Sequence, residues 1–258
     1  MPIVDLSSPV DAEGYEPDPV VHDVLTPAEG ALHMSEEMRK HFGIEFDPDE
    51  LPGSEFLSLD RITLTTHTGT HVDAPSHYGS TTSYGSGVPR NIDEMPLDWF
   101  FRPGVVLDIS DAKTTVVDAT RLRKEFTRIG YTPSPLDIVL LRTGASLLAG
   151  TPRYFTDFVG LEGTAVHLLL DLGVRVIGTD AFSLDAPFGD VITRYRETGD
   201  RSVLWPAHFA GRTREYCQIE RLANLEALPA HGFRVACFPV KIARAGAGWA
   251  RAVAITDD

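Results

Sequence analysis

The sequence predicts an α/β fold, and three observations indicate it. Apolar runs rich in β-branched residues recur along the 258 residues, segments with helical periodicity lie between several of them, and no internal repeat divides the chain. Strands mixed with helices along a chain favour a sheet with helices packed on it. We therefore expect a single domain over residues 1–258, with a mixed β core and peripheral helices.

The expected strands are the short runs in which apolar and β-branched residues concentrate. The runs cover residues 61–66, 104–109, 137–142, 174–178, 233–240 and 249–255.

Three segments between or after these strands have helical signals. Asp118 is a suitable N-cap for a helix over 119–129, and Gly173 is a natural C′ residue for a helix over 163–172. We expect a third helix over 219–228.

The segment 27–42 also has the spacing of a helix. Its apolar residues Met34, Met38 and Phe42 lie four apart and therefore share a face. Such a helix is either a lid or an arm that reaches a second subunit, or a surface helix packed on its own core. The glycine- and proline-rich stretch 78–96 is long for a loop in a compact domain, and long loops often cover a site.

Charge and hydropathy exclude two classes of partner. The chain has 37 acidic and 23 basic side chains, a formal net charge of -14, so its average surface repels nucleic acid and anionic lipid. No stretch approaches the roughly 18 to 20 apolar residues that a membrane span needs. We expect a cytoplasmic protein in which Cys217 and Cys237 are buried free thiols.

Three histidines and one aspartate fall within eleven positions in the segment 67–77. All four occupy odd-numbered positions, so in an extended chain they project to one side while Ile62, Leu64 and Val72 project to the other. The four residues are His67, His71, Asp73 and His77. One face of this segment is therefore expected to line a cavity.

A straight strand cannot bring this cluster onto one ion. Residues four apart in a strand are separated by roughly 13 Å, whereas histidine nitrogens lie about 2.0 to 2.2 Å from a bound metal. The chain must therefore curl at Gly69, where glycine permits such a bend. Because grouped imidazoles and a carboxylate are costly to bury without a cation, this segment predicts a metal site.

Further ligands must come from elsewhere in the chain. The candidates are His208, expected in a strand or loop that ends at Gly211, and Glu220, expected at the start of a helix. A carboxylate in the first turn of a helix also stabilises the helix dipole, so Glu220 has a purely structural alternative.

The run from His67 to His77 resembles the His-x-Gly-Thr-His-x-Asp-x-Pro-x-His signature of the metal-dependent cyclase family. This family includes bacterial kynurenine formamidases, isatin hydrolases and cyclases of aromatic polyketide pathways. The resemblance extends over most of the chain, because the segment 178–185 and the twelve-residue separation of His208 and Glu220 are also similar to the family's pattern.

The resemblance implies a swivelling β/β/α fold, assembled as a homodimer or homotetramer, and a role for each matching residue. His67, His71, Asp73 and Glu220 match metal ligands, and His77 matches the proposed acid/base. His208 matches either a ligand of a second ion or a residue that faces the substrate. Residues 34–38, 94–101 and 246–249 resemble the polyketide cyclases more than the shorter formamidases.

Imidazole and carboxylate ligands without thiolate favour a divalent ion, zinc or manganese. Such an ion polarises a carbonyl oxygen or lowers the pKa of water, and both uses need a nearby proton carrier, which His77 and His208 supply. The leading hypothesis is aldol-type ring closure of an aromatic polyketide intermediate; the alternative is hydrolysis of an aryl formamide or cyclic amide. A non-catalytic scaffold is a third reading, which an intact His77 argues against.

Two groups of side chains are secondary candidates around this site. Asp180, Ser183 and Asp185 follow the expected strand at 174–178 and serve either the site or the capping of a turn. Aromatic residues form either a flat pocket for an aromatic substrate or ordinary core packing. They are Trp99, Phe100, Phe101, Phe182, Phe188 and Trp205.

Overall fold

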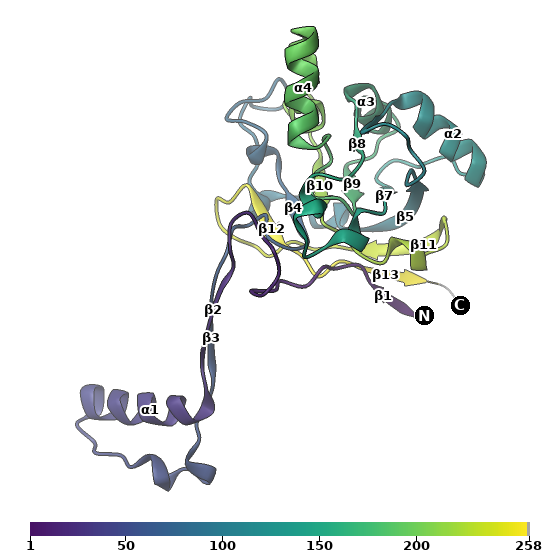
Figure 1. Ribbon diagram of the computed structural model, residues 1–258. Coiled ribbons are helices and arrows are strands. Elements are labelled where there is room, and N and C mark those ends of the chain that lie inside the picture. The colour runs from purple at the N-terminus through teal and green to yellow at the C-terminus, as the bar shows by residue number, and fades with distance from the viewer. Residues whose placement is uncertain (257–258) are drawn as a thin grey trace. The chain divides into compact units, whose positions relative to one another are not determined.

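The computed structural model describes residues 1–256 (Figure 1). Its contacts divide the chain into two compact units, Met1–Val10 with Thr66–Asp258, and Asp11–Thr65. We call the first the main unit and the second the inserted unit. The prediction of a single domain over 1–258 stays a prediction.

The main unit confirms the α/β class, because it is built on one mixed sheet of nine strands. The strand order is β1-β13-β11-β5-β7-β9-β10-β4-β12. The strands are β1 (Ile3–Asp5), β4 (His71–Asp73), β5 (Phe101–Asp108), β7 (Ile138–Arg142), β9 (Val176–Thr179), β10 (Cys217–Glu220), β11 (His231–Ala236), β12 (Ala247–Trp249) and β13 (Val253–Thr256). A separate two-stranded parallel ribbon pairs β6 (Val116–Val117) with β8 (Gly160–Leu161).

The centre of the sheet is parallel and buried on both faces. Strands β5, β7, β9 and β10 run parallel to one another, and their side chains alternate between two apolar cores. Val105 and Leu107 pack with helices α2 (Ala119–Ile129) and α3 (Gly163–Asp171), while Val106 packs in the other core with Val235 of β11. Figure 1 shows α2 and α3 across the central strands from β11 and β13.

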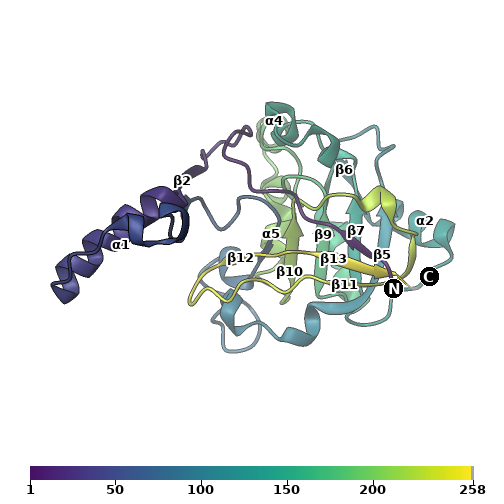
Figure 2. The ribbon, with the colours of Figure 1, turned by 90° about the horizontal axis from the view of Figure 1, so that it is seen from below.

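The second core joins both ends of the sheet, so the sheet is curled. Val72 of β4 and Ile219 of β10 share this core with Ala254 of β13, although β4 and β13 lie far apart in the strand order. The strands β1 and β13, which are the first and the last along the chain, pair antiparallel and lie side by side (Figure 2). Cys217 and Cys237 are buried free thiols, as the sequence predicts.

Two of the predicted helices are confirmed at their caps. The Asp118 side chain accepts a hydrogen bond from the backbone N–H of Arg121 at the start of α2. Helix α3 is followed by Gly173 at φ +86°, the left-handed conformation expected of a C′ glycine. The main unit also contains α4 (Phe188–Thr198) and α5 (Pro206–Ala210). Within residues 1–256, no helix is long and apolar enough to cross a bilayer.

The predicted helix over 219–228 is wrong. Residues Cys217–Glu220 form strand β10, and only Leu225–Ala227 form a short 3-10 turn. Arg221 and Asn224 adopt left-handed backbone conformations, at φ 63° and 56°, which interrupt a helix. Burial of Ile219 between two strands therefore overrides the helical spacing of the segment.

Three expected strands differ most from their expected bounds. The run 61–66 belongs to β3 (Leu59–Thr63) in the inserted unit, and its Ile62 is exposed rather than in a core. The run 233–240 ends as a strand at Ala236, and the run 249–255 divides into β12 and β13.

The inserted unit consists of an antiparallel ribbon and the predicted helix over 27–42. Strands β2 (Val21–Leu25) and β3 pair in the ribbon, and α1 (Pro27–Phe42) follows β2. Thr26 and Glu29 form a capping box at the start of α1. A Cβ at Gly30 would collide with the Leu57 carbonyl, so the absence of a side chain lets the two segments meet.

One glycine controls the approach of β8 to the segment after β9. A Cβ at Gly160 would collide with the backbone of Asp185 and Ala186. We expect Gly160→Ala to lower the free energy of unfolding by about 1–3 kcal/mol, because the collision involves backbone rather than a flexible side chain. Chemical denaturation measures this change. The control is Gly189→Ala in α4, where a Cβ meets nothing within 4 Å and stability should not fall; equal stability of both variants would contradict the prediction.

Candidate metal centre

Neighbouring antiparallel strands place the first three candidate ligands on one face. In β4, His71 and Asp73 project to one side while Val72 projects into the core. His71 lies directly opposite Glu220 of β10, and their side chains approach to 3.7 Å between Nε2 and Oε2. The correction to β10 therefore moves Glu220 from a helix start to the end of a strand, where it faces β4.

The predicted bend at Gly69 brings in the fourth residue. Gly69 has φ +67°, and a Cβ there would lie 2.9 Å from Val10 Cγ2, so both conformation and space favour glycine. The bend carries His67 back over the strand. His67 Nδ1 lies 3.0 Å from Asp73 Oδ1 and 3.2 Å from His71 Nε2.

Surrounding backbone groups orient two of these side chains. With Nδ1 protonated, the His71 ring donates a hydrogen bond to the Gly69 carbonyl at 2.9 Å, and its Nε2 then faces the cluster as a lone pair. The backbone N–H of Leu184 donates to Glu220 Oε1 at 2.9 Å. Contacts of this kind hold metal ligands in a fixed orientation.

The donor set fits a cation, as the Asp73 carboxylate shows most directly. Asp73 is fully buried, and neither of its oxygens accepts a hydrogen bond from any residue that the structure describes. Two imidazoles with nitrogens 3.2 Å apart point their donor atoms at the same space. A buried carboxylate without hydrogen bonds is costly, and a divalent ion removes that cost.

Electrostatics in the cluster are those of crowded, desolvated groups. Burial, followed by the adjacent Asp73 carboxylate, raises the pKa of Glu220. Burial alone would also raise the pKa of Asp73, but the neighbouring His71 and His67 outweigh it and hold that pKa well below its ordinary value. Two close carboxylates that differ in this way share a site suited to a positive charge.

His77 and His208 lie on the same cavity wall, beside the cluster. The ring centroid of His77 is 4.3 Å from that of His67 and 5.4 Å from that of His208. Partial burial of the ring lowers the pKa of His77 to about 4; the Asp73 carboxylate opposes this shift and the nearby imidazoles add to it. His208 Nε2 lies 4.0 Å from Asp73 Oδ2 and 3.9 Å from Glu220 Oε1.

Asp185 positions His208. Of the two roles expected for Asp185, a part in the site or the capping of a turn, the structure therefore supports the first. Asp185 accepts hydrogen bonds from the backbone N–H groups of Ala207 and His208 and lies 2.6 Å from His208 Nδ1. Burial would lower the pKa of His208, but this contact and the nearby carboxylates raise it to about 9. Asp180, by contrast, accepts from Thr143, Gly144 and Ser146 and therefore caps a turn.

The cluster forms the floor of a cavity of about 440 Å³, a volume within the usual range for small-molecule sites. Beyond the predicted histidines and Glu220, its wall contains several residues that the sequence analysis did not assign to a site. The lining residues are His67, His71, His77, Tyr78, Gly79, Phe182, Ser183, Trp205, His208, Phe209, Arg212 and Glu220.

The aromatic pocket was only partly predicted. Phe182 and Trp205 line the cavity, and Phe188 contacts Trp205 with ring centroids 5.3 Å apart. The other three candidates lie elsewhere: Phe100 is buried in the second core, Trp99 packs against that core, and Phe101 lies on β5 beneath the guanidinium of Arg234. From the long loop 78–96, only Tyr78 and Gly79 are among the lining residues.

Phe209 and Arg212 are the missed members of the cavity wall. They follow His208 in and just after α5, a segment that we expected to be a strand or loop. His208 and Arg212 are four residues apart, a spacing that places side chains on one face of a helix. Recognition of Pro206 as a first-turn helix residue would have revealed this relation.

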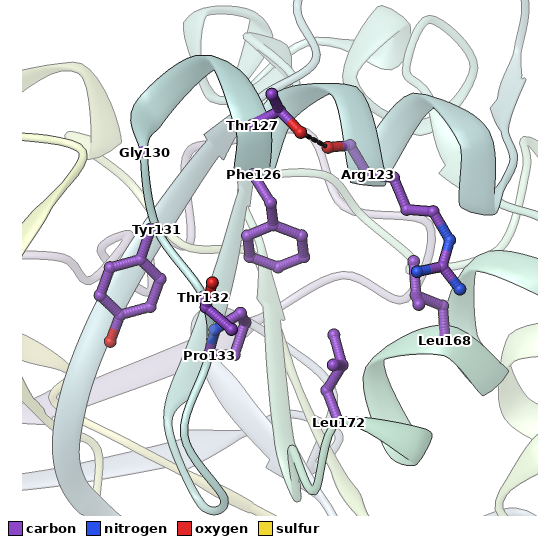
Figure 3. A pocket seen from close by; sticks show the side chains of 9 residues that line it. All are labelled: Arg123, Phe126, Thr127, Gly130, Tyr131, Thr132, Pro133, Leu168 and Leu172. Carbon is purple, nitrogen blue, oxygen red and sulfur yellow. Dashed lines mark hydrogen bonds between the residues drawn. The ribbon is translucent and has the colours of Figure 1, made fainter.

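A second cavity of about 430 Å³ lies between the end of α2 and α3. Figure 3 shows Phe126, Leu168 and Leu172 around it, with Arg123 reaching over one side. None of its nine lining residues is a histidine, cysteine or carboxylate. Of these two cavities, only that of the candidate metal centre contains side chains that could bind a metal ion.

The orphaned carboxylate generates a prediction about metal binding. We expect zinc or manganese to raise the melting temperature of the metal-free protein, and Asp73→Asn to remove most of that rise, because the substitution deletes the buried charge shared by His67 and His71. Differential scanning fluorimetry with a metal titration measures both effects. The control is Asp180→Asn, in the turn cap; a full metal-dependent rise in Asp73→Asn would contradict the assignment.

Known structures share the fold over the whole chain. Isatin hydrolase A from Labrenzia aggregata, bound to benzyl benzoate, is 23% identical and matches with a TM-score of 0.74, covering 100% of this chain and 94% of its own. Isatin hydrolase A from Ralstonia solanacearum is 20% identical, with a TM-score of 0.75 and coverage of 99% and 92%. At these identities the likeness shows the fold.

Sequence comparison shows the family. The "Putative cyclase" family matches residues 4–186, and the kynurenine formamidase of Salinibacter ruber is 30% identical over 201 residues, which cover 76% of this chain and 79% of that protein. Named relatives of both kinds are enzymes, which removes support from the scaffold reading. The cluster of histidines and carboxylates therefore lies in a chain of a known family. This chain is an enzyme of the cyclase family.

Proposed function

We propose that the protein is a metal-dependent hydrolase of an aryl amide, either an aryl formamide or a cyclic amide. The observation that carries the proposal is the position of His77, whose ring lies 4.3 Å from that of His67 at the wall of the cavity that contains the ligand cluster. A proton carrier thus stands beside the candidate metal site. The formamidase and isatin hydrolase names of the relatives support hydrolysis rather than polyketide ring closure.

His67, His71, Asp73 and Glu220 would hold the ion, and we propose zinc or manganese. A bound divalent ion supplies Lewis-acid polarisation of the amide carbonyl and lowers the pKa of water. His208, which Asp185 holds in place, would either bind a second metal ion or face the substrate. Its Nε2 lies about equally far from Asp73 and Glu220, which suits both roles.

The chain's own residues would complete the reaction. Phe182, Trp205 and Phe209 offer aromatic surface for the aryl ring, which would leave the amide over the ligand cluster. His77 would take a proton from the attacking water and return it to the departing nitrogen. An amine and formate are the products from a formamide, and a single ring-opened acid is the product from a cyclic amide.

We expect His77→Gln to lower kcat for formate release from an aryl formamide by about 10²- to 10⁴-fold, since general acid–base groups contribute factors of that size. Metal content, measured by elemental analysis, should remain equal to that of the starting protein. The control is His167→Gln, an exposed histidine of α3 outside the cavity. Full activity of His77→Gln would remove the proposed role, and turnover of a poly-β-ketone but of no amide would favour ring closure instead.

We also propose that the protein assembles with a second copy of itself through the inserted unit. Only three of its residues are buried, Val20, Gly30 and Ala31, and a two-stranded ribbon is marginally stable by itself. Large apolar side chains remain exposed on it, among them Val24, Ile62 and Leu57 at 51%, 48% and 70%. Exposed apolar surface of this kind marks protein interfaces.

We expect light scattering after size exclusion to give the mass of at least two chains. Ile62→Ser, which removes apolar surface from the ribbon, should shift the mass toward one chain at low concentration. The matched control is Val88→Ser, an apolar residue of the main unit that is 70% exposed. A single-chain mass for the unmodified protein would contradict the proposed assembly.

A further inference from the structure

One side chain on the wall of the metal cavity carries a permanent positive charge. Arg212 is the only arginine or lysine among the twelve residues that line it. Three imidazoles on that wall, those of His67, His71 and His208, lie against carboxylates, whereas Arg212 forms no ion pair with a carboxylate in residues 1–256. Its neighbour Arg214, in contrast, pairs with Asp171.

Two contacts and one glycine fix the position of the Arg212 guanidinium. Its Nε donates a hydrogen bond to the Tyr78 carbonyl, and its Cζ lies 3.9 Å from the ring centroid of Phe209. A Cβ at Gly79 would lie 2.8 Å from Arg212 Nε, so glycine at this position gives the side chain room. A side chain fixed in this way loses little conformational entropy when it binds a ligand.

These contacts leave the two terminal nitrogens of the guanidinium for a ligand. Stacking on Phe209 uses the face of the group and Tyr78 uses Nε, so the remaining N–H donors lie along one edge. The planar edge of a guanidinium matches the two oxygens of a carboxylate. A local cation is also needed for such a ligand, because the protein as a whole carries a net charge of -14 and repels anions.

We propose that Arg212 is a specificity-determining residue that binds an anionic group, a carboxylate, on the aromatic amide substrate. This inference rests on the proposed hydrolase function and specifies its substrate class. The amide lies over the ligand cluster, the aryl ring contacts Phe209 and its neighbours, and the carboxylate meets the terminal nitrogens of Arg212. Neutral aryl amides of the same size lack this contact and bind less tightly.

The test compares charged and neutral substrates on the metal-loaded enzyme. The probes are the 2-, 3- and 4-formamidobenzoates and their neutral methyl esters, assayed for formate release. We expect kcat/KM for at least one acid to exceed that of its ester by about tenfold, chiefly through KM, since charge-assisted hydrogen bonds contribute this much or more. Added salt should reduce the preference.

Variants separate recognition from a structural role. Arg212→Met should lower the acid-to-ester ratio to about one, Arg212→Lys should retain part of it, and Gly79→Ala should lower it by displacing the guanidinium without removing its charge. The matched control is Arg214→Met, whose partner Asp171 lies outside the cavity. An unchanged ratio in Arg212→Met, or an equal loss for acids and esters, overturns the proposal.

A binding measurement keeps this inference distinct from the proposed function. Benzenesulfonate, an anion that is a poor metal ligand, should bind at least several-fold more tightly than the neutral methyl phenyl sulfone, and Arg212→Met should abolish the difference. If no probe releases formate but this difference is present, the hydrolase proposal fails and the anion site stands. If formate is released but neither comparison shows a preference for the anion, the anion site fails alone.

Discussion

Two buried carboxylates beside several imidazoles are the constraint on which the site depends. Asp73 is fully buried without a hydrogen bond to its oxygens from any described residue, and Glu220 lies on the adjacent strand. A protein that folds with these groups together accepts a large desolvation cost. Apolar burial in the second core offsets that cost, because Val72 and Ile219 pack there from the opposite face of the same two strands.

Rigidity around the cluster follows from where its residues are placed. Strands β4 and β10 fix the backbone of His71, Asp73 and Glu220, while Gly69 O and Leu184 N–H fix the rotation of side chains. Asp185 performs the same task for His208 from the segment after β9. Precise placement of this kind is what metal-assisted catalysis requires, because small displacements of a reacting group lower the rate strongly.

Specificity has a different physical basis from the chemistry. A metal held by the ligand cluster would act on any amide carbonyl placed correctly over it, so the cluster by itself would not distinguish one amide from another. In the proposed hydrolase, selectivity would come from the cavity wall, where Phe182 and Trp205 offer aromatic surface and Arg212 a fixed cation. These residues belong to segments after strands and around α5, where the sequence pattern has the least regular signal.

The sequence by itself determined the α/β class, the helices at 27–42, 119–129 and 163–172, and the grouping of His67, His71 and Asp73 around a bend at Gly69. These features depend on local periodicity, capping residues and backbone freedom, all of which are set by residues close together in the sequence. Only the tertiary structure decided that Glu220 ends a strand, that Asp185 orients His208, and that Arg212 rather than Trp99 lines the cavity. Each of these depends on contacts between distant segments, and burial against another strand overrode the local helical pattern at 219–228.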